Sequence, residues 1–149
     1  MNKRKETKDL EYKVYEHYYL KHSLNCALEV SIPFGGRADF VGLKKKEVTV
    51  VEIKVSKQDF KSKNGHNFYG HKNYYAMTQE LFEQVKDDID SHIGVIVLDN
   101  FDRFKIVKNA RNTKNKYPAR FYEVLTKNIE TAKQSNIRRL LYHRYKGVN

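Results

Sequence analysis

Two carboxylates and a lysine, Asp39, Glu52 and Lys54, stand in a pattern that could support chemistry on a charged substrate. Residues 48–55 carry apolar side chains at both alternating sets of positions, as expected of a central strand covered on both faces. Within this strand Glu52 and Lys54 are two residues apart and therefore share one face. Charged side chains in such a strand are costly unless they are paired or bind an ion. The pattern predicts a polar site near the end of this strand.

Asp39 is expected to lie opposite Glu52. If residues 44–47 form the loop of an antiparallel hairpin, the Cβ atoms of these two residues are about 4.5–5.5 Å apart. Two carboxylates at that distance repel each other unless a cation lies between them. Lys54 could be that cation, in a buried ion-pair triad without chemistry. The alternative, which we favour, is Mg²⁺ or Mn²⁺, because such ions bind carboxylate oxygens and water.

The rest of the chain supplies elements that could position this site within a single domain of residues 1–149. Periodic apolar residues predict helices over 7–21, 79–88 and 118–145, with a further helix that begins at Ser56 or Lys57. Apolar runs predict strands over 26–32, 38–43, 48–55, 74–78, 93–98 and 104–107. This order is typical of an α/β fold with a central mixed β-sheet flanked by helices. We expect a core over about 7–108 and a basic helical C-terminal extension over about 109–149.

The net charge of +11 is carried entirely by the last third of the chain. Residues 1–102 contain equal numbers of basic and acidic side chains, whereas residues 103–149 contain 13 Lys or Arg against Glu123 and Glu130. Such a segment attracts polyanions, and DNA is the first partner we expect, with RNA compatible with the same charge. Aromatic residues lie among these cations, namely Tyr117, Phe121, Tyr122, Tyr142 and Tyr145. They either stack on bases or form the buried stripe of a helix.

Further basic residues are candidates for contacts with a phosphate backbone. They are Lys57, Lys61, Lys63, His66, His71 and Lys72, which we expect to cluster beyond the strand, with Arg37 before the first carboxylate and Arg138 and Arg139 in the C-terminal helix. The alternative is a solvated loop or, for Arg37, an ion pair with an acidic neighbour. Ser56 and Asp59 lie where they could cap the following helix or touch a phosphate.

Composition excludes several classes of protein. Cys26 is the single cysteine, so neither an intramolecular disulfide nor a cysteine-based zinc cluster can form. The first residues are charged rather than apolar, and the longest apolar run, Ile93–Leu98, is too short to span a bilayer. We therefore expect a cytoplasmic protein without a signal peptide or membrane segment.

The motif residues resemble a known family. Asp39, followed after a hairpin by Glu52-Ile53-Lys54, is similar to the motif of the PD-(D/E)xK nuclease superfamily, with Ala38 in place of the usual proline. The stretches 37–39 (Arg-Ala-Asp) and 51–60 (Val-Glu-Ile-Lys-Val-Ser-Lys-Gln-Asp-Phe) look most like the MmcB-type DNA-repair subgroup. The resemblance covers about residues 10–108 and leaves the C-terminal helix unmatched.

This resemblance implies a restriction-endonuclease-like fold and a role for each residue of the motif. Asp39 and Glu52 would bind the metal together with the main-chain carbonyl of Ile53, and Lys54 would be the catalytic lysine. In that superfamily a helix ahead of the strands often adds a carboxylate, for which Glu16 is the first candidate and Glu11 the second. Many members also pair two subunits to cut both strands, which would make this chain a homodimer.

The sequence therefore predicts a divalent-metal-dependent DNA nuclease that hydrolyses phosphodiester bonds. Its setting would be DNA repair, recombination or the processing of phage or mobile-element DNA. The alternative is a nucleic-acid-binding module that keeps the fold without activity. A protein-interaction domain is a third interpretation, but it leaves the basic C-terminal third unexplained.

Overall fold

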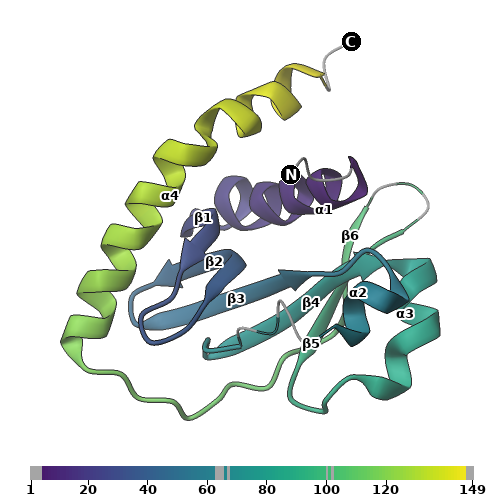
Figure 1. The fold of residues 1–149 in the computed structure, drawn as a ribbon, viewed down its shortest axis with the longest axis horizontal. Coiled ribbons are helices and arrows are strands. Elements are labelled where there is room, and N and C mark those ends of the chain that lie inside the picture. Colours follow the sequence, from purple (N-terminus) through teal and green to yellow (C-terminus); the bar gives the residue numbers. More distant parts are fainter. Residues whose placement is uncertain (1–4, 63–65, 67, 100, 102, 147–149) are drawn as a thin grey trace.

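One six-stranded sheet organises the fold in the computed structural model, which describes residues 5–62, 66, 68–99, 101 and 103–146 (Figure 1). From residue 139 onward only the course of the backbone is described. In the order of the sheet, which is also the order of the chain, the strands are β1 (Asn25–Ser31), β2 (Arg37–Lys44), β3 (Glu47–Ile53), β4 (Lys72–Thr78), β5 (Gly94–Leu98) and β6 (Phe104–Lys108). β1 to β3 form an antiparallel meander, β4 and β5 run parallel to β3, and β6 is antiparallel to β5. The predicted α/β fold with a mixed sheet is confirmed.

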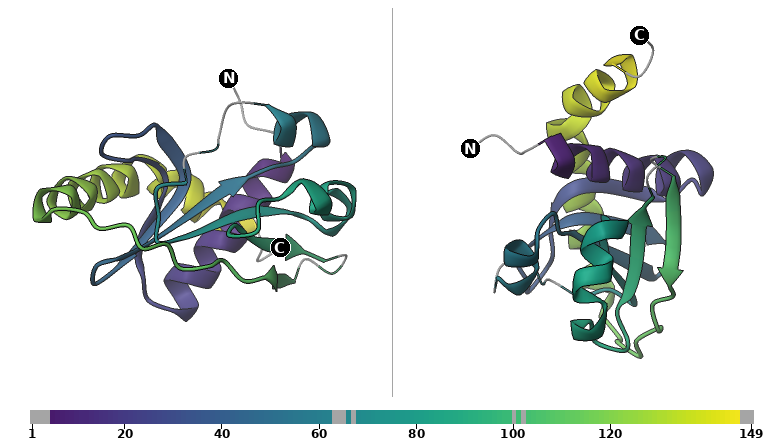
Figure 2. Two further views of the ribbon diagram at one scale, coloured as in Figure 1. Left: turned by 90° about the horizontal axis from the view of Figure 1, so that it is seen from below. Right: turned by 90° about the vertical axis from the view of Figure 1, so that its right-hand side faces the viewer.

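Helices cover both faces of this sheet (Figure 2). The helical segments are α1 (Lys5–Tyr15), the π-helical η1 (Glu16–Lys21), α2 (Lys57–Lys61), α3 (Gln79–Val85), the 3-10 segment η2 (Lys86–Asp88) and α4 (Ala119–Lys146). α1 and η1 pack on one face through Leu10, Val14 and Tyr18. On the other face α4 covers β1 to β3, while α2 and α3 cover β4 and β5. None of the described helices combines the length and the apolar character needed to cross a lipid bilayer.

The β2–β3 hairpin has the expected register, but its turn is shorter than the four-residue loop over residues 44–47 that the sequence led us to expect. Phe40 pairs with Val51 and Lys44 pairs with Glu47, so that a two-residue turn joins the strands. Because side chains alternate between the two faces, a slip of one residue would exchange the buried and the exposed sets. The register therefore decides which side chains of β3 face α1 and which face α2 and α4.

α4 is a layer of the core. Its residues Phe121, Leu125, Ile129 and Ala132 recur at helical spacing, and all four are buried against the first three strands. The sequence led us to expect a basic extension beyond a core that ended near residue 108. In the structure this apolar stripe joins the helix to the sheet, so that residues after 108 complete one face.

Truncation of the α4 stripe tests this packing. Leu125 is completely buried, so Leu125→Ala should lower the free energy of unfolding by about 2–5 kcal/mol because it leaves a cavity between α4 and the sheet. Lys127→Ala, at an exposed position of the same helix, should change it by less than about 0.5 kcal/mol. Denaturant unfolding followed by circular dichroism gives both values. Equal stability of Leu125→Ala and the natural protein would contradict the packing of α4.

Candidate active site

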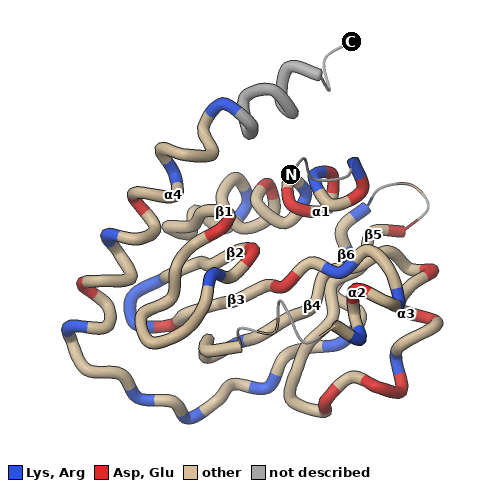
Figure 3. The backbone as a smooth tube through the Cα atoms, in the orientation of Figure 1, with Lys and Arg blue, Asp and Glu red and all other residues tan. Residues whose placement is uncertain are grey.

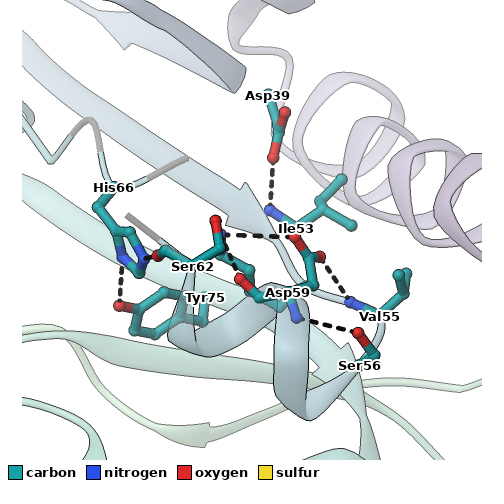
Figure 4. A network of polar contacts seen from close by, with 9 residues as sticks. Asp39, Ile53, Val55, Ser56, Asp59, Ser62, His66 and Tyr75 are labelled. Carbon is teal, nitrogen blue, oxygen red and sulfur yellow. Dashed lines mark hydrogen bonds and ion pairs between the residues drawn. The ribbon is translucent and has the colours of Figure 1, made fainter. Parts of the chain in front are cut away.

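β2 and β3 part at one end, and Asp39 lies at the point where they separate (Figure 4). Their antiparallel ladder ends with the pair Phe40 and Val51. Beyond it, Oδ2 of Asp39 accepts a hydrogen bond of 2.8 Å from the main-chain N–H of Ile53. The carboxylate thus takes the place of the carbonyl partner that a continued ladder would supply. The contact brings Asp39 to the residue that directly follows Glu52.

Glu52 and Lys54 are both buried, with 0% and 2% of their surfaces exposed. Glu52 lies on the face of the sheet that α2 and α4 cover, because it alternates with Val50, which packs under α4. Its neighbour in the parallel ladder is Tyr75 of β4. Burial raises the pKa of Tyr75 to about 12, with further contributions from the negative charges of Asp90 and Glu52. The hydroxyl of Tyr75 therefore stays protonated at neutral pH.

Asp59 connects the beginning of α2 with Lys54. The Lys54 ammonium group donates to the main-chain oxygen of Asp59 at 3.3 Å and lies 3.9 Å from its Oδ1. Oδ2 of the same carboxylate accepts from the main-chain N–H of Val55 at 3.2 Å, and Ser56 Oγ accepts from the N–H of Asp59 at 3.0 Å. The prediction of helix capping is confirmed for Ser56, whereas the Asp59 carboxylate binds the N–H of Val55, just before the helix. The link from Asp59 to the lysine had no separate signal in the sequence.

The carboxylate that α1 turns toward the sheet is Glu11. Only 1% of Glu11 is exposed, and its neighbour Leu10 packs in the core beneath the helix. Glu16, our first candidate from the sequence, opens η1 and is partly exposed. Glu11 is thus the more buried of the two, but α1 packs on the face of the sheet opposite to the one on which Glu52 lies. Among the described residues, no three or more His, Cys, Asp or Glu side chains form a group that could hold a metal ion.

The basic residues that we expected around the site do not form one cluster. Lys57 and Lys61 are exposed on α2, close in sequence to Lys54. Lys72 instead begins β4, and its Nζ lies 3.4 Å from the carboxylate of Glu47 at the start of β3. Because β4 runs parallel to β3, the chain must return along the sheet before β4 begins, so Lys72 is at the opposite end. A single cluster was therefore wrong for Lys72, and Lys63 lies outside the described residues.

The two histidines of the same segment have partners within the fold. The ring of His66 is hydrogen-bonded to the hydroxyl of Tyr75 at 2.9 Å. His71 uses both ring nitrogens, one toward the main-chain N–H of Val48 and the other toward the main-chain oxygen of Asn115. Both histidines thus connect elements of the structure.

Arg37 and Arg138 are exposed, so a ligand could reach either of them. Arg37 also lines a cavity of about 350 Å³ between β1 and α4, to which Asn128 and Asn136 contribute. The side chain of Arg139 lies outside the described residues.

The described aromatic residues at the beginning of α4 are structural. Phe121 is 2% exposed, and Tyr117 stacks on it with ring centroids 3.9 Å apart and planes inclined by 9°. Tyr122 packs against the same apolar cluster. The interpretation of a buried stripe therefore holds for these three residues, whereas the side chains of Tyr142 and Tyr145 lie outside the described ones.

Fold and site together define the class of protein: a mixed α/β domain in which two strands part beside a buried carboxylate and a buried lysine. A family described as "DNA repair protein MmcB-like" matches residues 3–142. The chain belongs to this MmcB-like DNA repair family. The match includes most of α4, which the resemblance seen in the sequence did not cover.

Among solved structures, the chain is similar to the SPO1766 protein of unknown function from Silicibacter pomeroyi. The two are 24% identical, with a TM-score of 0.69 over 96% of this chain and 94% of that one. At this identity the likeness shows a common fold. A search of curated proteins finds no match.

The cap of α2 can be tested by Ser56→Ala. Loss of the hydroxyl leaves the N–H of Asp59 without its acceptor, so the free energy of unfolding should fall by about 1 kcal/mol. Ser135→Ala, at an exposed position within α4, is the matched control and should not destabilise, because alanine is the better helix former. Denaturant midpoints measure both effects. A larger loss in the control than in Ser56→Ala would contradict the capping role.

Proposed function

We propose that this protein is a divalent-metal-dependent DNA nuclease of the PD-(D/E)xK superfamily. The observation that carries the proposal is the burial of Glu52 and Lys54 beside the point where Asp39 bridges the parted ends of β2 and β3. Apolar side chains would build the same strand without the cost of removing two charged groups from water. A chemical role explains why the strand nevertheless contains them.

The donor groups of the site suit Mg²⁺ or Mn²⁺. Asp39 and Glu52 offer carboxylate oxygens and Ile53 a main-chain carbonyl, and such hard oxygen ligands, supplemented by water, are those these ions prefer. The further carboxylate that the resemblance implies, Glu16 or Glu11, stays a prediction. A bound ion of this kind polarises a phosphoryl oxygen and lowers the pKa of a coordinated water.

Lys54 would act on the substrate phosphate. Its ammonium group is already directed by the main-chain oxygen of Asp59, so little reorganisation is needed when negative charge develops on the phosphate. Its burial strengthens that interaction, since water screens it less. The exposed Lys57 and Lys61 on α2 would contact neighbouring phosphates and position the DNA strand.

DNA as the polymer is supported by the description of the family and by the net charge of +11. RNA carries the same phosphate charge and is the natural competitor in a binding assay. The pairing of two subunits to cut both strands stays a prediction.

A nucleic-acid-binding module without activity is the second candidate function. It is favoured by the lack, among the described residues, of a group of three metal-binding side chains. In such a module Lys54 would serve only as a buried counter-charge. A nuclease needs a divalent ion, whereas a binding module should bind DNA equally well in EDTA.

Charge removal within the site distinguishes the two functions. Glu52→Gln and Lys54→Met keep the approximate size of each buried side chain, and each should lower the cleavage rate by about 100-fold or more. Lys57→Met removes the same charge from an exposed position of α2 and should lower the rate by less than about tenfold. Single-turnover assays on supercoiled plasmid, circular single-stranded DNA and a branched oligonucleotide, each with Mg²⁺, Mn²⁺ or EDTA, supply the rates.

Thermal melting shows whether the variants are folded. Cleavage that persists in EDTA, or in both folded variants, would contradict the proposed nuclease. Binding of every DNA without cleavage under any condition would favour the binding module.

A further inference from the structure

A strongly basic surface lies at the end of the sheet opposite to the candidate active site (Figure 3). It consists of residues 44–47 at the β2–β3 turn, which we call the tip, and of residues 109–120. We call the two together the tip–strap surface. Its cations, all exposed, are Lys44, Lys45, Lys46, Arg111, Lys114, Lys116 and Arg120. The acidic residue of these two segments is Glu47, whose carboxylate lies 3.4 Å from Nζ of Lys72. Apart from Glu47, which is paired with Lys72, the charged side chains of this surface are therefore positive.

The strap, residues 109–118, crosses the edge of the sheet at which the parallel strands begin (Figure 1). It passes close to the start of β5, where a Cβ on Gly94 would lie 2.6 Å from the main-chain nitrogen of Ala110. Just before β4, the N–H of Thr113 donates to the main-chain oxygen of His71 at 2.8 Å. The strap then leads into α4. Three segments distant in sequence thus meet at this edge.

His71 connects the strap to the β2–β3 hairpin through two hydrogen bonds. Nδ1 of His71 accepts from the main-chain N–H of Val48 at 3.0 Å, so Nε2 carries the ring proton and donates to the oxygen of Asn115 at 3.0 Å. The hydroxyl of Tyr117 donates to the oxygen of Tyr69 at 2.7 Å. The strap backbone is therefore already ordered, and less entropy is lost when its cations bind a ligand.

The tip and the strap border one cavity of about 350 Å³. Its lining residues are Lys44, Lys45, Lys46, Glu47, His71 and Asn112. Ammonium and amide groups are donors that hold phosphate oxygens in protein–DNA contacts. The cavity thus brings several donors to one place, and Lys72 pairs with Glu47, the carboxylate in its lining.

Lys45 occupies a backbone conformation that a lysine seldom adopts. Its φ is +55°, in the left-handed region where glycine is favoured. The turn would form with less strain if this residue were glycine. The strain at this position directs attention to the lysine side chain.

We propose that the tip–strap surface anchors the phosphate backbone of duplex DNA at a distance from the candidate active site. β3 runs from Glu47 beside the tip to Ile53 beside the site, and at about 3.3 Å per residue it spans about 20 Å. About six base pairs of duplex cover that length. Anchoring by itself is independent of the proposed function, whereas its spacing from the point of cleavage rests on it.

Binding to a duplex of about 20 base pairs in EDTA tests the anchor without any cleavage. Lys45→Gly should weaken binding about tenfold at 0.1 M salt, and the triple variant Lys44→Ala, Lys45→Gly, Lys46→Ala about 100-fold. The slope of log K against log salt should shrink by about 0.9 for each lost phosphate contact. Lys86→Ala, which removes one exposed cation beside α3, is the matched control and should bind like the natural protein.

Thermal melting separates binding from folding. Because Lys45→Gly removes strain, its melting temperature should equal or exceed that of the natural protein, so weaker binding cannot be ascribed to unfolding. If the triple variant binds duplex DNA with unchanged affinity and salt slope, the proposal is overturned. The proposal is also overturned if the triple variant loses no more affinity than the control Lys86→Ala.

The spacing is tested by cleavage of hairpin-capped duplexes of different length. The triple variant should lower kcat/KM on duplexes that extend well beyond about six base pairs from the cut and leave shorter ones unaffected. Equal effects at all lengths would overturn the spacing. If Glu52→Gln and the natural protein both bind through the tip but neither cuts, the anchor stands and the nuclease proposal fails.

Discussion

The parting of β2 and β3 at Asp39 is the constraint on which the rest of the structure depends. A continued ladder would bond the N–H of Ile53 to a main-chain carbonyl, but here the side chain of Asp39 accepts that hydrogen bond. The carboxylate is thereby held where the strands separate. Glu52, on the strand that continues, stays fully buried beside it. Where the two strands separate, the side chain of Asp39 thus satisfies a main-chain N–H that would otherwise lose its hydrogen-bond partner.

The short connection after β3 gives this place its rigidity. Ser56 caps α2 through the N–H of Asp59, and the main-chain oxygen of Asp59 accepts a hydrogen bond from the ammonium group of Lys54. The next residue, Phe60, is buried and packs against Tyr75, with ring centroids 5.1 Å apart. Helix capping, core packing and the orientation of one lysine therefore depend on the same few residues. A change in any of them would be felt at the site as well as in stability.

The parallel strands divide the molecule into two ends with different chemistry. At the end where β3 finishes, a few charged groups are buried, whereas at the end where β3, β4 and β5 begin, many exposed cations face water. Buried charges interact strongly over short distances, and exposed ones act through counter-ion release along a polymer. A nuclease of the kind we propose would need both kinds of surface.

The sequence by itself determined the local features, because they follow from residues close in the chain. The alternation of apolar residues predicted the strands, and the hairpin register holds up to the pair Phe40 and Val51, beyond which the ladder ends before Asp39 and Glu52 pair. Only the tertiary structure decided the arrangements that depend on distant segments. The rotation of α1 on the sheet buried Glu11, and the parallel direction of β4 moved Lys72 away from the site. Packing against non-local elements governs both, and periodicity within one segment carries no information about it.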